Sequence, residues 1–334
     1  MTSTTRIHSV GDAGFAEFLA GIGHRRPTAS RTPVDVAIIG HTGQVGRALL
    51  SQLATSRPDP RGPALVFREG INRSRHLVVD RREVREVGRD RGSLAGLGER
   101  LAAGGRPAVI VDCTADADLP RSYPAWLRAG IGVVTPNKHG FAGDLSLYRA
   151  IHESARLGNA PLGYSATVGA GLPILSTLRR LHQAGSEPTH ISAVVSGTLA
   201  HVFSRMAGGL ALSAAVGDAR ERGFTEPDPL EDLSGRDVAR KLLIMLREAG
   251  LEGLAVEREP VVADAWAARA REAANVMEAL RECDGTWRRR FESAQAAGET
   301  WVYLARVGPG EARVGPVRLP ADSPFAVTGG SGNI

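Results

Sequence analysis

Short apolar runs alternate with amphipathic segments along the first half of the chain. The runs predict strands at residues 35–39, 64–67, 109–113 and 132–135. Apolar positions spaced three and four apart predict helices at residues 47–54, 122–129 and 145–157. Strands and helices that alternate in this way are typical of a parallel, doubly wound α/β sheet. We therefore predict such a domain over residues 34–160, after a flexible or helical arm at residues 1–33.

The pattern changes after about residue 160. Helical spacing predicts helices at residues 175–181, 199–206, 213–222, 234–249 and 273–282. Further apolar runs predict strands at residues 190–196, 302–307 and 312–318. The second half, residues 161–334, is therefore expected to be an α+β domain on a mixed or antiparallel sheet.

The 334 residues allow two domains, and no apolar run approaches the ~20 residues that cross a bilayer. The apolar cluster at residues 15–22 is interrupted by Glu17 and is unlike a signal peptide. The two cysteines, Cys113 and Cys283, lie far apart in the sequence. We therefore expect buried free thiols, a reducing and hence cytoplasmic compartment, and no structural zinc.

The net charge of +5 could indicate a nucleic-acid partner. The basic residues are scattered, however, and aromatic residues make up only 5% of the chain, too few for base-stacking platforms. We therefore expect a small-molecule substrate, and neither a nucleic acid nor a membrane as partner.

Only two of the 41 basic residues are lysines, Lys138 and Lys241. A chain that uses arginine wherever a positive charge suffices can keep lysine where a compact ammonium must release its proton. Chance retention is the alternative, so the neighbours of each lysine have to decide between the two.

Three glycines follow the first predicted strand, at Gly40, Gly43 and Gly46. Glycines let the backbone approach a pyrophosphate, and the N-terminus of the next helix offers free N–H groups. The spacing G-x-x-G-x-x-G differs from the usual G-x-G-x-x-G, and an ordinary tight turn is the alternative. Its place after the first strand of an alternating pattern favours a Rossmann-type dinucleotide site.

The end of the second strand discriminates between NAD and NADP in such folds. An acid there binds the ribose hydroxyls of NAD, whereas arginines accept the 2′-phosphate of NADP. Arg73 and Arg75 favour NADP, and Glu69 favours NAD. We expect NADP, with NAD possible, and a solvated basic loop is the alternative without a cofactor role.

Two polar segments are candidates for chemistry. Residues 135–138, Thr-Pro-Asn-Lys, follow a strand at the sheet edge where ligands bind. In residues 223–241, Asp237 and Lys241 lie four apart on a predicted helix that Ser234 can cap, so they share one face. Four acids occupy the predicted loop before that helix, Glu226, Asp228, Glu231 and Asp232. A solvated surface ion pair is the alternative, but the crowded acids and the rarity of lysine favour a proton-transfer site.

These segments resemble signatures of the homoserine dehydrogenase family, as do residues 164–174, YSATVGAGLPI, and residues 196–199, SGTL. The resemblance runs from about residue 34 to about residue 250 and continues weakly to the end. It implies NAD(P)H-dependent reduction of L-aspartate 4-semialdehyde to L-homoserine, or the reverse, as a step of threonine and methionine biosynthesis. It also implies a homodimer paired through the second domain.

The resemblance further implies roles for individual residues. Lys241 would donate the proton to the carbonyl oxygen, and Asp237 would hold its ammonium group. Glu226 would bind the substrate α-ammonium group, and Lys138 would lie between substrate and nicotinamide. The other residues expected to bind substrate are Gly197, Thr198 and Asp232.

The glycine turn and the resemblance together give the expected cofactor-binding residues: Gly40, Thr42, Gly43, Gln44, Val45, Gly46, Arg73, Arg75, Thr114 and Lys138. The resemblance also implies a monovalent cation, Na⁺ or K⁺. Its expected ligands are the backbone carbonyls of Ser165, Val168, Ala170 and Leu172.

Four features depart from the family pattern. Ser165 stands where an acid is usual, Phe224 where a tyrosine is usual, and Ala200 and His201 replace a polar–aromatic pair. The family's chains also continue into a glycine-rich turn and a final helix that return to the cofactor domain, whereas this chain stops at Ile334. Either this final segment is missing from the sequence or the cofactor site is shortened. Without an aspartokinase or regulatory module, we expect no feedback by threonine within this chain.

Three functions stay open. The first is homoserine dehydrogenase activity itself. The second is a dehydrogenase of the same fold that acts on another small amino-acid aldehyde or ketone in specialised metabolism, which the residues at 200, 201 and 224 favour. The third is a non-catalytic dimeric binding protein, against which the retained residues at 138, 226, 237 and 241 argue.

Overall fold

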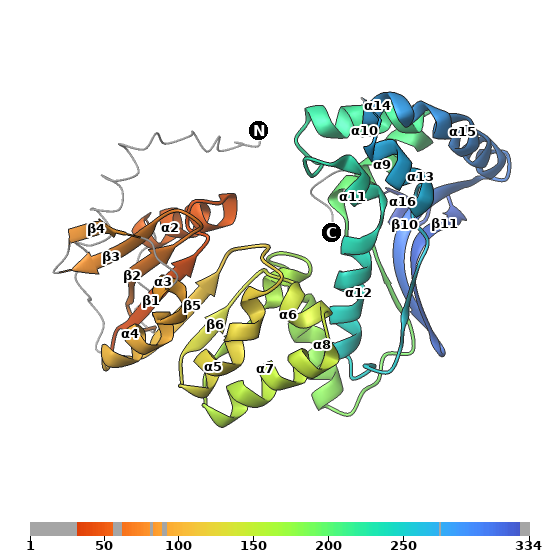
Figure 1. Cartoon of the computed structure of the whole chain (residues 1–334). Coiled ribbons are helices and arrows are strands. Elements are labelled where there is room, and N and C mark those ends of the chain that lie inside the picture. The colour runs from red at the N-terminus through yellow and green to blue at the C-terminus, as the bar shows by residue number, and fades with distance from the viewer. Residues whose placement is uncertain (1–31, 56–61, 81–82, 89–91, 274, 328–334) are drawn as a thin grey trace. The chain divides into compact units, whose positions relative to one another are not determined.

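The computed structural model describes residues 32–55, 62–80, 83–88, 92–273 and 275–327 (Figure 1). The chain separates into two compact units, an N-terminal unit, Met1–Thr167, and a C-terminal unit, Val168–Ile334. The arm expected at residues 1–33 lies almost entirely outside the described residues.

A seven-stranded sheet forms the N-terminal unit, in the order β4-β3-β2-β1-β5-β6-β7 (Figure 1). The strands are β1 (Val34–Ile39), β2 (Leu65–Ile71), β3 (His76–Asp80), β4 (Glu83–Val87), β5 (Ala108–Asp112), β6 (Gly132–Val134) and β7 (Leu162–Gly163). β1 pairs in parallel with β2 on one side and with β5 on the other, and β6 and β7 continue the parallel sheet. The predicted doubly wound parallel sheet is confirmed. The antiparallel edge formed by β3 and β4 was not predicted, because charged residues obscure its apolar pattern.

The helices of this unit follow the strands in the expected alternation. They are α2 (Gln44–Thr55), α3 (Gly92–Ala95), α4 (Leu97–Ala103), η1 (Leu119–Ser122), α5 (Tyr123–Arg128), α6 (His139–Ala142), α7 (Leu145–Leu157) and η2 (Ser165–Thr167). Alternate residues of β1 point into one core, where Val36 and Ile38 pack with Leu50 of α2 and Phe67 of β2. The period of two along β1 therefore attaches α2 to one face of the sheet.

The C-terminal unit is built on a four-stranded sheet in the order β8-β10-β11-β9. Its strands are β8 (Ile191–Ala193), β9 (Val256–Arg258), β10 (Glu299–Gly308) and β11 (Glu311–Pro320). β8, β10 and β11 are antiparallel, and β9 joins β11 in parallel, so the predicted mixed sheet is confirmed. Pro309 and Gly310 form the two-residue turn of the central hairpin, where Gly310 has a φ of 77°.

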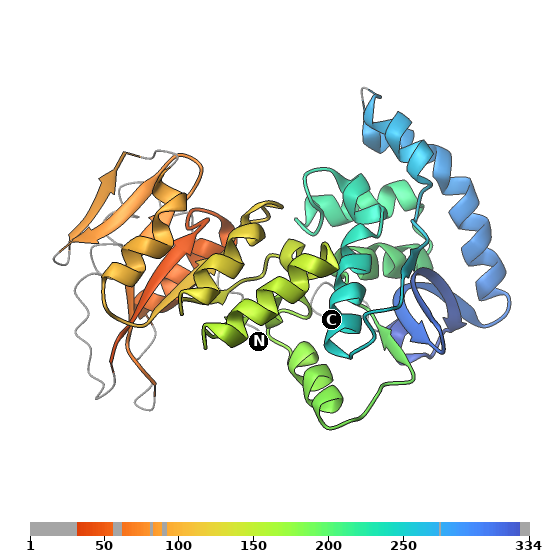
Figure 2. The same cartoon turned by 60° about the horizontal axis from the view of Figure 1, so that its bottom comes forward.

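Nine helices of the described C-terminal residues surround this sheet. They are α8 (Ile174–Gln183), α9 (Gly197–Ala207), α10 (Leu212–Glu221), α11 (Pro229–Leu233), α12 (Arg236–Glu248), α13 (Asp264–Arg271), α14 (Val276–Ala279), α15 (Arg281–Gln295) and α16 (Pro324–Val327). The helix predicted at residues 273–282 is wrong in its extent. Trp287, Phe291 and Ala294 give α15 a buried stripe at helical spacing within an arginine-rich sequence, and Figure 2 shows this helix beside the hairpin.

Two expectations from composition can be compared with the structure. Among the described helices, none is long and apolar enough to cross a membrane. Cys113 and Cys283 are both free thiols, but they are only half-buried, so the expectation of full burial is wrong. Both cysteines lie next to polar or exposed positions, which explains the partial exposure.

Candidate active site

The glycine turn joins the end of β1 to the start of α2, as the sequence predicts. Gly40 has a φ of 80°, which favours glycine. A Cβ on Gly46 would lie 2.3 Å from the Gly40 carbonyl oxygen and 2.7 Å from His41 Cα. The chain therefore folds back on itself so closely that only glycine fits at position 46. The result is a bare backbone cradle at the N-terminus of α2, where a pyrophosphate can bind.

Side chains from the loops after β2 and β5 lie against this turn, and they include the predicted cofactor residue Thr114. Asn72 follows β2, and its Nδ2 donates to Thr42 Oγ1 at 3.0 Å. Thr114 follows β5, and its methyl group lies 2.9 Å from the position of a Cβ on Gly40. The loops after β2 and β5 thus meet the glycine turn at one edge of the sheet, on both sides of β1. This is the topological switch point at which doubly wound sheets bind nucleotides.

The structure corrects the place assigned to Glu69. The prediction set this acid at the end of the second strand, but β2 continues to Ile71. Glu69 is 6% exposed, and its carboxylate accepts hydrogen bonds from Arg100 at 2.9 Å and contacts His76 Nε2 at 2.9 Å. Those partners neutralise the acid inside the unit, so it is not available to a ribose. The exposed Arg73 and the half-buried Arg75 lie in the loop that follows β2.

A buried histidine, which the sequence did not single out, lies inside the glycine turn. His41 is 0% exposed, and Gly70 of β2 packs against its ring. Burial lowers the pKa of His41, so the ring is neutral near pH 7. A neutral ring adds no charge to the cradle.

The segment that carries Lys138 is fixed by a buried hydrogen-bond network. Asp112, at the end of β5, is 0% exposed and accepts hydrogen bonds from Tyr123 Oη, from Asn137 Nδ2 at 3.0 Å and from the Thr114 N–H at 2.7 Å. Burial, with the Asp112 charge beside it, raises the pKa of Tyr123 well above its usual range. Asn137 also donates to the Asp116 carbonyl at 2.8 Å. The network therefore ties the loop after β5 to the loop after β6, directly before Lys138.

Lys241 lies on α12 in the C-terminal unit and is largely buried. Its side chain is 16% exposed, and Nζ lies 3.0 Å from Asp237 Oδ2, one turn earlier. Nζ also donates to the carbonyl oxygen of Val195, 46 residues earlier in the chain, at 2.6 Å. The predicted pairing of Asp237 with Lys241 is present, and the surface ion pair considered as its alternative does not describe a buried ammonium.

The acids before α12 are more ordered than the sequence suggested. Glu231 and Asp232 lie in the short helix α11, which Asp228 caps by accepting from the Leu230 N–H at 3.0 Å. Gly235, with a φ of 69°, is the N-cap of α12 in place of the predicted Ser234. A side chain at position 235 would collide with Tyr303, and the Ser234 hydroxyl instead accepts from the Arg236 N–H at 3.2 Å.

One hydrogen-bonded group connects the predicted substrate residues Thr198, Glu226 and Asp232. Asp232 Oδ2 accepts from the Glu226 N–H at 2.9 Å, and the Thr198 hydroxyl donates to the Phe224 carbonyl at 2.5 Å. Burial raises the pKa of Asp232, against the hydrogen bond from Glu226. Gly197 and Thr198 form the first turn of α9, which Ser196 caps by accepting from the Leu199 N–H. Residues 224–232, which form the acid segment, are therefore attached to the start of α9.

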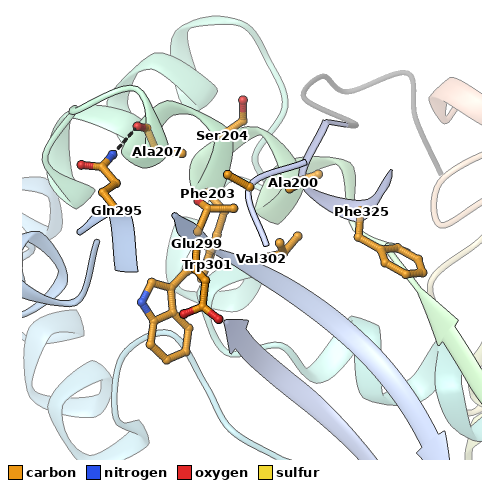
Figure 3. A pocket seen from close by; sticks show the side chains of 12 residues that line it. Ala200, Phe203, Ser204, Ala207, Gln295, Glu299, Trp301, Val302 and Phe325 are labelled. Carbon is orange, nitrogen blue, oxygen red and sulfur yellow. Dashed lines mark hydrogen bonds between the residues drawn. The ribbon is translucent and has the colours of Figure 1, made fainter. Parts of the chain in front are cut away.

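Ala200 and His201, which depart from the family pattern, point to different surroundings. A cavity of about 210 Å³ lies beside the sheet, and its lining includes Ala200 of α9, Val302 of β10 and Phe325 of α16. Figure 3 shows these side chains. Gln295 closes one side, since its Nε2 donates to the Ala207 carbonyl at 2.9 Å (Figure 3). Ala200 thus packs on the sheet, whereas the His201 ring lies against Phe224 of the acid segment.

The remaining predicted residues are divided between the two units. Lys138 occupies the N-cap position of α6 in the N-terminal unit without a side-chain capping bond, and Lys241 belongs to the C-terminal unit. Of the carbonyls expected to bind a cation, Ser165 belongs to the N-terminal unit and Val168, Ala170 and Leu172 to the C-terminal unit. Within the described part of the chain, no group of three or more His, Cys, Asp or Glu side chains could hold a metal ion.

The chain is similar to known homoserine dehydrogenases along most of its length. A family model described as homoserine dehydrogenase matches residues 173–334, and one described as homoserine dehydrogenase, NAD binding domain, matches residues 42–164. A homoserine dehydrogenase of Emericella nidulans is 40% identical over 247 residues, which are 70% of this chain and 67% of the relative. A bifunctional aspartokinase/homoserine dehydrogenase 1, chloroplastic, of Arabidopsis thaliana is 38% identical over 93% of this chain. The chain spans only 36% of that bifunctional relative.

Solved structures have the same fold. A Candida auris protein of unknown function is 28% identical, with a TM-score of 0.78, and the match covers 90% of this chain and 88% of that one. A hyperthermophilic archaeal homoserine dehydrogenase, solved in complex with NADPH, is 24% identical with a TM-score of 0.67. That match covers 89% of this chain and 85% of the archaeal one, and it supports the fold.

Proposed function

The chain belongs to the homoserine dehydrogenase family, and from this premise we propose that it reduces L-aspartate 4-semialdehyde to L-homoserine with NAD(P)H, or catalyses the reverse reaction. The observation that carries the proposal is the environment of Lys241. An ammonium group has three N–H donors. Among the described residues, Asp237 and the Val195 carbonyl take two of them, which leaves the third for a substrate oxygen.

The chemistry requires a proton at the oxygen when the carbonyl carbon gains a hydride. A reduced nicotinamide supplies the hydride when it is bound. Lys241 donates the proton to the aldehyde oxygen as negative charge develops there, so that the aldehyde becomes a primary alcohol. In the reverse direction, the neutral amine of Lys241 accepts the hydroxyl proton. A buried, pre-oriented donor stabilises this oxygen more than water would, because it needs no reorganisation.

The substrate's own charges are matched by the acid segment. We assign Glu226 to the α-ammonium group, because its carboxylate is exposed and Asp232 fixes its backbone. The backbone at Gly197 and Thr198 offers polar contacts at the start of α9, and Asp232 lies near both Glu226 and Asp237. Lys138 is assigned a place between the substrate and the nicotinamide.

The bare cradle formed by Gly40, Gly43 and Gly46 fits a dinucleotide pyrophosphate. Thr42, Gln44, Val45 and Thr114 would line the same turn, and Lys138 would complete the set. We propose NADP as the preferred cofactor, because Arg73 and Arg75 follow β2 while the competing acid Glu69 is already bonded to Arg100.

Three further assignments extend the proposal. A Na⁺ or K⁺ ion would bind carbonyls of Ser165, Val168, Ala170 and Leu172, where Gly169 and Ala170 have φ values of 76° and 49° that turn the backbone sharply. We also propose a homodimer, from the family resemblance. The two free thiols favour a reducing compartment such as the cytoplasm.

The test is an assay of NADPH oxidation with L-aspartate 4-semialdehyde. The parent should turn over, and Lys241→Ala should lose on the order of 10²–10⁴ in kcat. Arg240→Ala, at the exposed neighbouring position of α12, is the matched control and should keep the parent rate. Tight NADPH binding without turnover would favour another small amino-acid aldehyde or ketone as substrate. No NADPH binding would favour a non-catalytic binding protein.

A further inference from the structure

A buried histidine on α9 contacts the segment that carries Glu226. His201 is 8% exposed, and its ring meets Phe224 edge-on, with centroids 5.1 Å apart and planes at 72°. Its Nε2 lies 2.6 Å from Asp218 Oδ2 on α10. The ring is therefore held at its polar edge by a carboxylate while its face and other edge pack in the interior.

Asp218 is itself fixed by cations on two helices. Arg205 of α9 lies 3.3 Å from Oδ2, and Arg222 lies 3.2 Å from Oδ1. The hydrogen bond with His201, followed by the contacts with these arginines, lowers the pKa of Asp218. The carboxylate is thus ionised across the working pH range, and it gives the His201 ring one preferred orientation.

Besides the bond from the Phe224 N–H to the Ala219 carbonyl at 2.9 Å, three further contacts hold residues 224–226. His201 packs against the Phe224 ring, Thr198 donates to the Phe224 carbonyl at 2.5 Å, and Asp232 accepts from the Glu226 N–H at 2.9 Å. Two of the three attachments come from α9. The Phe224 side chain has no hydroxyl and cannot form a hydrogen bond, so the place of its ring depends on packing.

We propose that His201 is a positioning residue that determines specificity for an α-amino substrate. Held by Asp218, its ring fixes Phe224, and Phe224 sets the backbone that presents the Glu226 carboxylate two residues later. The inference rests on the proposed function, since it assigns Glu226 to the substrate ammonium group. It adds a chain of contacts, Asp218 to His201 to Phe224, that acts on the substrate only through Glu226.

A double-mutant cycle tests this coupling. His201→Leu removes the aromatic ring and the hydrogen bond at similar volume, and Glu226→Gln removes the charge on which the ring is proposed to act. In the parent background, His201→Leu should raise the KM for L-aspartate 4-semialdehyde on the order of tenfold. In the Glu226→Gln background it should change KM less than about twofold, because the carboxylate that it positions is gone.

Conservative variants and controls separate this role from simple destabilisation. His201→Phe keeps the ring contact and should recover part of the loss, and NADPH affinity should stay at the parent value in every variant. His190→Leu, at an exposed histidine of the same unit, should leave KM unchanged. Multiplicative effects in the cycle, or a fall in kcat with KM unchanged, would overturn the inference alone. A parent enzyme inactive on the aldehyde would overturn the proposed function, and the inference with it.

Discussion

Lys241 Nζ lies 3.0 Å from Asp237 Oδ2, yet only 16% of the lysine side chain is exposed against 46% of the aspartate. An ordinary i, i+4 ion pair on a helix surface exposes both partners and contributes little to stability. Here the lysine side chain is largely buried, whereas nearly half of its counter-ion is exposed. On the proposed function, the pair orients a proton donor, and we expect its contribution in catalysis before stability.

Asp237→Asn keeps the size and a hydrogen-bond acceptor of the side chain but removes its charge. Because hydrogen bonds to charged groups contribute ~1.5–3 kcal/mol, we expect kcat to fall roughly 10- to 100-fold while NADPH affinity is unchanged. The measurement is steady-state kinetics beside denaturant unfolding. Glu221→Gln, at an exposed acid at the end of α10, is the control. Equal losses of stability and of kcat would assign Asp237 to the fold.

Gly46→Ala should weaken nucleotide binding. The added Cβ would lie 2.3 Å from the Gly40 carbonyl oxygen, and neither group is a flexible side chain that could move aside. Overpacking of this kind costs ~1–3 kcal/mol, so we expect the Kd for NADPH to rise at least about fivefold, as measured by fluorescence titration. Gly88→Ala, where a Cβ meets nothing within 4 Å, should bind as the parent does. Unchanged affinity in Gly46→Ala would remove the turn from the cofactor site.

Arg73→Ala tests the preference for NADP. The exposed Arg73 follows β2, and a guanidinium–phosphate hydrogen bond is worth ~1.5–3 kcal/mol. The variant should lose at least about tenfold in kcat/KM with NADPH and stay within about twofold with NADH. Arg121→Ala, an exposed arginine of the same unit, should change neither value. A parent that prefers NADH would contradict the NADP assignment before any variant is made.

Much of this architecture could be predicted, and the reason is local periodicity. Helix α7 was predicted with the bounds that the structure has, Leu145–Leu157, because its buried residues repeat at helical spacing. The pairing of Asp237 with Lys241 follows from a separation of four on one helix, and the rarity of lysine indicated which pair to examine. Information of this kind lies within one helix or one strand.

Contacts between distant segments could not be predicted in the same way. The Val195 carbonyl reaches Lys241 across 46 residues, and Arg100 reaches Glu69 across 31. Neither partner carries a local signal, because any carbonyl or arginine could have filled the role. The error on Glu69 arose for this reason: its place in the sequence suggested a ribose ligand, and only the fold reveals the arginine that occupies it.

Tyr123→Phe should destabilise the N-terminal unit. The Tyr123 hydroxyl donates to the fully buried Asp112, and a buried carboxylate that loses a donor costs ~1–3 kcal/mol. Thermal unfolding should report the loss in the transition of this unit. Tyr303→Phe, which removes a bond to the neutral carbonyl of Glu259 at 2.8 Å, is the matched comparison and should cost less. If Tyr303→Phe costs as much, the charge of Asp112 is not what makes the network valuable.

Glu248 makes stability depend on pH in the opposite sense to most ion-paired acids. Its side chain is 2% exposed, and burial raises its pKa to about 7, although Arg179 Nε donates to Oε2 at 2.8 Å. An acid of raised pKa binds more protons in the folded state than in the unfolded state. The free-energy penalty for burying its charge is therefore absent below the ordinary pKa of 4.5 and complete above about 7.

Relative to Glu248→Gln, the parent should therefore lose ~1–3 kcal/mol of unfolding free energy between about pH 5 and about pH 8. Urea titrations of both proteins at the two pH values measure this difference, with the exposed Glu187→Gln as a control that should show none. A parent that gains stability over the same range would mean that the Arg179 ion pair outweighs the cost of burying the charge.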